Sequence, residues 1–178
     1  MRLDRLKAMM PAPATGGDSI DWATAEAALG RRFPTDYREF IELYGAGTIS
    51  DHLGVAHPVS VSGPGERPTD VAEETEEARF TFGRTRAGLP AEVVDDSALI
   101  GWGHSDAADA LCWLAIGPDS DRWPVVVWSD FERKWLVHDV GMVDFLVGLL
   151  AGELDECPLS DLSLWGRPSQ QFINWRDA

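Results

Sequence analysis

Residues 29–47 read LGRRFPTDYREFIELYGAG, and this stretch decides how the N-terminal part of the chain is expected to fold. Gly30 is a favourable stop for a helix over residues 22–29, because glycine tolerates positive φ. Pro34 disfavours helix at the residue before it and so forces an extended step. The stretch therefore predicts a helix, a tight turn and a second helix that ends at Gly45.

The second helix is expected to be amphipathic. Its large apolar residues recur with the spacing i, i+3, i+4 and i+7, at Tyr37, Phe40, Ile41 and Tyr44. Charged residues cover the opposite side, and Thr35 is the expected N-cap. This pattern predicts that one face of the helix packs against a core.

Apolar runs in the second half of the chain predict successive short strands. They cover residues 99–103, 110–116, 123–128 and 134–138, and turn residues separate them. The middle runs are apolar on both faces. We therefore expect helices on one face of an antiparallel sheet and partial shielding of the other.

A helical stripe follows these strands, formed by Met142, Phe145, Leu146, Leu149 and Leu150. This helix should lie on the sheet. The patterns together indicate an α+β fold with an N-terminal helix pair, an antiparallel β-sheet of about four to six strands, and a C-terminal helix packed on the sheet.

The length of 178 residues fits one domain. The proline- and glycine-containing residues 1–17 are expected to form a flexible N-terminal segment, followed by a single domain over residues 18–178. Residues 63–97 are expected to be a variable insertion or loop region. The acidic run at residues 70–77 within it fits either a solvated helix or a mobile loop.

Two blocks of motifs carry a family resemblance. The first is the stretch 29–47, and the second consists of short motifs at residues 99–102, 109–113, 124–128 and 144–146. In order and spacing, residues 19–152 resemble the SMI1/KNR4 (SUKH) superfamily, with poor matching at 63–97. The chain departs from the family pattern at Ala46 and Ala110.

The resemblance implies an α+β fold with N-terminal helices and an antiparallel sheet. It also implies protein binding through a concave face rather than catalysis. Bacterial members are similar to immunity proteins encoded beside polymorphic toxins, often nucleases. Eukaryotic relatives look like regulators of cell-wall synthesis and signalling.

The charge of the chain points to the kind of partner. There are 15 lysine and arginine residues against 30 aspartate and glutamate residues, a formal net charge of −15. Direct binding to nucleic acid or to an anionic membrane requires cations, so neither is expected. A basic protein would be steered toward such a surface. The alternative is that the charge only confers solubility.

The chain is expected to act in the reducing cytoplasm. Two cysteines, Cys112 and Cys157, are too few for a disulfide scaffold. No signal-peptide core is recognised near the N-terminus, and no apolar run approaches the roughly 20 residues of a membrane helix.

Exposed tryptophan beside aspartate is typical of surfaces that bind basic partners. The partner-binding candidates on this basis are Asp51, Trp102, Asp106, Asp109, Trp128 and Asp130. The alternative for the tryptophans is that they only pack in the core.

A metal-dependent hydrolase is a third possibility. His104, Asp106 and Asp109 lie close in sequence, and His57 or the pair His138-Asp139 could add ligands. The competing interpretation is an ordinary hairpin loop, in which aspartate and serine bond to the nearby backbone. No phosphate-binding glycine motif occurs, and no catalytic, cofactor-binding or metal residue is predicted.

The sequence thus favours a non-catalytic, protein-binding domain of the immunity type, whose partner is a basic toxin domain. A regulatory or scaffold module with an endogenous partner is the alternative. The oligomeric state is left open.

Overall fold

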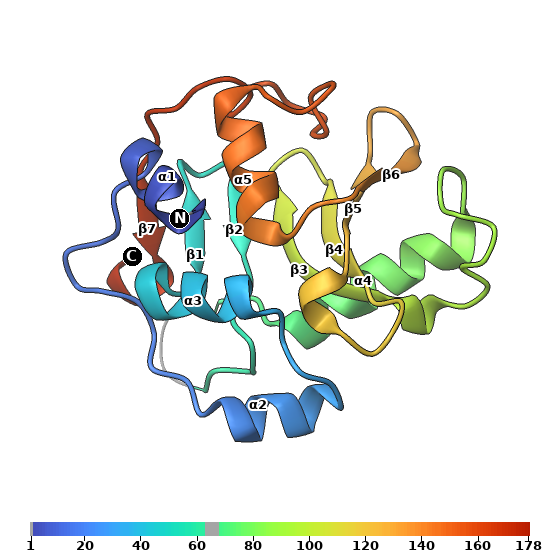
Figure 1. Ribbon diagram of the computed structural model, residues 1–178, viewed down its shortest axis with the longest axis horizontal. Helices are drawn as coiled ribbons and strands as arrows, with labels where there is room; N and C mark the ends of the chain where they lie inside the picture. The colour runs from blue at the N-terminus through green and yellow to red at the C-terminus, as the bar shows by residue number, and fades with distance from the viewer. Residues whose placement is uncertain (1, 63–67) are drawn as a thin grey trace.

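The computed structural model describes residues 2–62 and 68–178 and shows an α+β fold (Figure 1). The helices are α1 (Arg2–Met9), α2 (Trp22–Leu29), α3 (Thr35–Tyr44), α4 (Val71–Arg84) and α5 (Met142–Ala151). The strands are β1 (Gly47–Ile49), β2 (Leu53–Val55), β3 (Leu99–Ser105), β4 (Ala110–Leu114), β5 (Val125–Ser129), β6 (Lys134–His138) and β7 (Phe172–Asn174). Within the described residues these strands form one antiparallel sheet.

The strands follow the order β6-β5-β4-β3-β2-β1-β7 in a 7-stranded sheet. The predicted meander is confirmed over β3 to β6, where neighbours in sequence are neighbours in the sheet. The sheet exceeds the predicted four to six strands because β7, from the C-terminal tail, pairs with β1 at the edge.

Helices cover both faces of the sheet. In β4, Leu111 and Trp113 point into the larger core beneath α1, α3 and α5, whereas Cys112 and Leu114 point into a smaller core beneath α4. Figure 1 shows α3 and α5 in front of the sheet and α4 behind it. The face expected to be only partly shielded therefore carries a helix of its own.

The N-terminal helix pair forms as predicted. Asp21 caps α2 by accepting a hydrogen bond from the Thr24 amide, and Gly30 ends it with φ 73°. The prediction for Thr35 is wrong: Pro34 occupies the N-cap position of α3, and Thr35 is the first helical residue. Its hydroxyl donates to Asp121 Oδ2 at 3.0 Å, which ties α3 to the segment before β5.

Residues 1–17, expected as a flexible segment, contain helix α1. Leu6 in α1 and Met10, directly after the helix, are fully buried, and α1 packs against α5. The Tyr44 hydroxyl donates to the Met10 carbonyl at 2.6 Å. These tertiary contacts hold a short, polar helix in place.

Residues 63–67 of the region 63–97 lie outside the described residues. The part that is described, residues 68–97, is mostly ordered structure. The acidic run belongs to α4, whose N-terminus is a capping box formed by Asp70 and Glu73. Glu74 is buried rather than solvated. The run is thus a helix, and one of its carboxylates faces the sheet.

Helix α4 approaches β3 closely because the strand carries glycine there. A Cβ built on Gly101 would lie 2.4 Å from the Glu74 carbonyl carbon. The Gly101 amide donates to Thr75 Oγ1 at 2.9 Å, so α4 also satisfies the backbone of β3 at a β-bulge between Gly101 and Gly103. This contact sets the position of the pocket described below.

Candidate protein-binding site

The turns that follow β1, β3 and β5 gather at one end of the sheet, in the upper part of Figure 1. We call this surface the turn end and define it as residues 50–52, 106–109, 130–133 and 160–163. The Asp106 amide donates to the His52 carbonyl at 2.9 Å, which joins the first two turns. The Asp130 amide donates to Asp109 Oδ1 at 3.0 Å, which joins the next two.

Asp109 is the structural centre of the turn end, not part of its surface. Its residue is 1% exposed, and its carboxylate accepts four hydrogen bonds within the described residues. The donors are the Ser105 hydroxyl, the Asp130 amide, and the amide and hydroxyl of Ser160. Because Asp109 is buried and each of its carboxyl oxygens already accepts two hydrogen bonds, it has no free oxygen to offer a partner, and its predicted recognition role is corrected.

Asp51, Asp106 and Asp130 do reach the surface of the turn end. Asp51 is exposed in the β1–β2 turn, with φ 62°. Asp106 Oδ2 lies 2.9 Å from His52 Nδ1, and Asp130 Oδ1 lies 2.8 Å from Arg133 Nη1. The topology therefore brings three of the six candidates to one surface.

Trp102 does not belong to this surface. Its side chain is fully buried in the larger core, with its ring centroid 6.2 Å from those of both Trp113 and Phe145. No partner can touch it in this structure, and the packing alternative holds for this residue.

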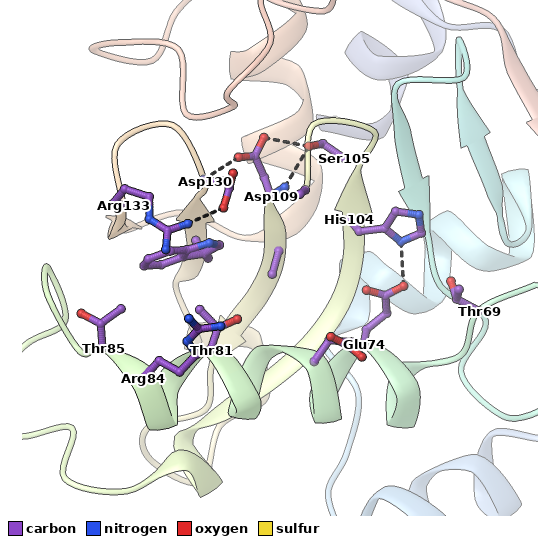
Figure 2. A pocket seen from close by; sticks show the side chains of 14 residues that line it. Thr69, Glu74, Thr81, Arg84, Thr85, His104, Ser105, Asp109, Asp130 and Arg133 are labelled. Carbon is purple, nitrogen blue, oxygen red and sulfur yellow. Dashed lines mark hydrogen bonds and ion pairs between the residues drawn. The ribbon is translucent and has the colours of Figure 1, made fainter.

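Trp128 borders a pocket between α4 and the sheet, which we call the α4 pocket (Figure 2). Its volume is about 460 Å³. Trp128 is nearly buried, and the guanidinium of Arg133 stacks over its ring at 5.3 Å. This stacking and the Asp130 pair fix Arg133 at one side of the pocket mouth, as Figure 2 shows.

The opposite side of the α4 pocket holds the pair formed by His104 and Glu74. His104 Nδ1 lies 2.7 Å from Glu74 Oε1, and the Glu74 side chain is almost fully buried (Figure 2). The hydrogen bond to Glu74 raises the pKa of His104 above its ordinary 6.5, while desolvation opposes the shift. The direction of this shift means that the hydrogen bond to Glu74 favours the protonated form of His104.

The β-bulge places His104 in this pocket. Simple alternation from Trp102 would put His104 on the same face as that buried tryptophan. The register shift between Gly101 and Gly103 adds one residue to the strand, so His104 instead faces α4.

The candidate metal ligands do not converge. His104 is directed to Glu74, Asp106 to His52, and Asp109 to Ser105 and Ser160. His57 Nδ1 lies 2.6 Å from the Val59 carbonyl oxygen, and the His138 ring packs on Phe145. No group of three or more histidine, cysteine, aspartate and glutamate side chains in residues 2–62 and 68–178 is arranged to hold a metal.

Sequence reasoning missed two apolar residues at the turn end, Phe131 and Leu162. They are 78% and 62% exposed, and an acidic residue lies next to each in sequence. The available signal was a phenylalanine inside a polar hairpin turn, between Asp130 and Glu132, where glycine, asparagine or serine is the usual choice.

Comparison with known proteins identifies one family. The model of the SMI1 / KNR4 family (SUKH-1) matches residues 16–146. This match runs from before α2 into the first half of α5 and includes the first three segments of the turn end. No curated protein and no solved structure matches the chain. In the described part of the chain, no helix has the length and apolar character needed to cross a membrane.

Proposed function

Because the chain belongs to the SMI1/KNR4 family (SUKH-1), we propose that it is a cytoplasmic, non-catalytic immunity protein. It binds a basic toxin domain and blocks that domain by covering its active site. Family membership supports a protein-binding module. The toxin partner and its charge are inferred from the surface of this chain.

The observation that carries the proposal is the charge of the turn end. Five carboxylates lie exposed or part-exposed there, against one arginine in the same segments. They belong to Asp51, Asp106, Asp130, Glu132 and Asp161. A basic toxin would be steered to this end by the local field and by the net charge of −15.

The proposal expects a toxin gene beside the gene of this chain, and the test is co-expression with that toxin. The triple variant Asp51→Lys, Asp106→Lys and Asp130→Lys is expected to slow association with the purified toxin domain about 10-fold to 1000-fold at low salt. It should also weaken protection of the host cell. The loss should shrink at high salt, because screening already removes the steering in the wild type.

A matched control changes the same number of charges elsewhere. Glu39, Glu76 and Glu92 are exposed on α3, on α4 and in the loop after α4. If their triple lysine variant loses as much protection as the turn-end variant, net charge rather than this surface is responsible. If the neighbouring toxin does not bind the wild type at all, the immunity assignment is wrong and an endogenous partner becomes the better explanation.

A further inference from the structure

Phe131 and Leu162 are two exposed apolar residues on the turn end, and we call them the apolar anchors. Phe131 sits in the β5–β6 turn and Leu162 in the loop that follows α5. The Phe131 amide donates to Ser160 Oγ at 2.9 Å, so the two segments lie against each other. Neither side chain is used by the fold to fill the core.

The apolar anchors rest on a rigid base. Ser160 is held by Asp109, which receives both its amide, at 2.8 Å, and its hydroxyl. Asp109 also receives the Asp130 amide, one residue before Phe131. A single buried carboxylate thus fixes the backbone beside each anchor, which lowers the entropy lost when a partner covers them.

The charges around the apolar anchors limit what can cover them. Asp130, Glu132 and Asp161 flank the anchors in sequence, and Asp106 lies in the adjoining turn. Arg133 and Lys134 are the nearest cations in sequence, and they are engaged with Asp130 at 2.8 Å and with Glu132 at 3.5 Å. The turn end therefore presents exposed apolar side chains among acidic ones, which fits the plan of a protein-binding surface with an apolar centre and a polar rim.

We propose that Phe131 and Leu162 insert together into an apolar cavity with a basic rim on the partner protein, and that they control how long the complex lasts. This inference rests on the proposed function and names the contact that holds the partner after the acidic residues have attracted it. A second copy of this chain is a poor occupant, because two acidic rims would repel each other.

The experiment measures the association and dissociation rates of the toxin domain proposed as the partner, with the wild type and with the variant Phe131→Ala plus Leu162→Ala. Loss of a central aromatic anchor typically weakens binding about 30-fold or more. We expect this loss in the dissociation rate, with the association rate and its salt dependence unchanged.

A matched control uses an equally exposed pair on other parts of the molecule. Phe80 on α4 and Val94 in the loop after it are 65% and 69% exposed. The variant Phe80→Ala plus Val94→Ala should leave both rates unchanged. An equal loss in this control, or an unchanged dissociation rate in the anchor variant, would overturn the inference while leaving the proposed function in place.

A third variant tests the rigid base. Ser160→Ala keeps both anchors but removes the acceptor of the Phe131 amide, so this amide should exchange its hydrogen faster and dissociation should quicken several-fold. An unchanged hydrogen-exchange rate of the Phe131 amide and an unchanged dissociation rate of the complex would contradict the role of the rigid base.

Absence of wild-type binding would overturn the proposed function together with the inference. Self-association of the wild type that the anchor variant abolishes would replace the basic partner by a second copy.

Discussion

The two faces of the sheet are filled in different ways. On the face beneath α3 and α5, the Trp113 ring lies 5.0 Å from that of Tyr37 and 6.2 Å from that of Trp102. On the opposite face, Trp128 and Trp135 pair at 5.6 Å, but Trp128 also borders the α4 pocket. One face is closed by aromatic packing, and the other keeps an opening.

The difference follows from where α4 lies. This helix packs mainly on β3 and less on β4, so the ends of β4 and β5 nearest the turn end are left without a helix above them. Charged and hydroxyl side chains line that opening together with Trp128. We therefore expect the closed face to contribute more to stability than the face that carries the α4 pocket.

The largest expected effect compares two tryptophans. Trp113→Ala on the closed face should lower the free energy of unfolding by about 3–5 kcal/mol, because it leaves a large internal cavity. Trp128→Ala should cost about half as much, since water in the α4 pocket can fill the space. Urea unfolding followed by circular dichroism measures both. Equal losses of unfolding free energy would show that the two faces of the sheet contribute equally to stability.

A second comparison uses two glycine variants, one where α4 packs on β3 and one on the exposed side of α4. Gly101→Ala places a Cβ 2.4 Å from the Glu74 carbonyl carbon, so it should push α4 away and destabilise the fold by about 1–3 kcal/mol. Gly83→Ala, on the exposed side of α4 with no atom within 4 Å, should stabilise the helix by about 0.5–1 kcal/mol. If thermal unfolding shows no loss for Gly101→Ala, α4 is not held tightly against β3.

The smallest effect concerns the pair in the α4 pocket. The hydrogen bond to Glu74 raises the pKa of His104 above 6.5, so the pair contributes stability below that pH and loses it as the pH rises through the raised value. Glu74→Gln should lower the titration midpoint of His104 in NMR spectra. Glu77→Gln, which lines the same pocket, is the control and should move this midpoint far less. Equal shifts would mean that the general field, not the hydrogen bond, sets the pKa.

Much of the fold could be predicted because local sequence patterns specify it. The i, i+3, i+4 spacing of Tyr37, Phe40 and Ile41 and the apolar runs of β3 to β6 both specify burial directly. Helix α1 and strand β7 carry weak patterns of 8 and 3 residues. They are stabilised by contacts with α5 and β1, which no local pattern shows.

The site could be predicted only in part, for a related reason. Four aspartates could be selected as candidates from the sequence, but which of them are buried is decided by what packs on them. Asp106 and Asp109 look alike in sequence, yet only Asp109 is covered, by Ser160. The position of His104 depends on a β-bulge that strand alternation does not reveal.

The bonds between Asp109 and Ser160 also bear on the order of folding. They join residues 51 positions apart, whereas each hairpin of the turn end closes over a few residues. Local hairpins form early, and contacts between distant residues form late. The Asp109 carboxylate is therefore expected to stay solvated until the segment after α5 docks. The proposed partner surface would then be among the last parts of the molecule to form. A nascent chain that has not yet reached residue 160 would present the turns without the segment that covers Asp109.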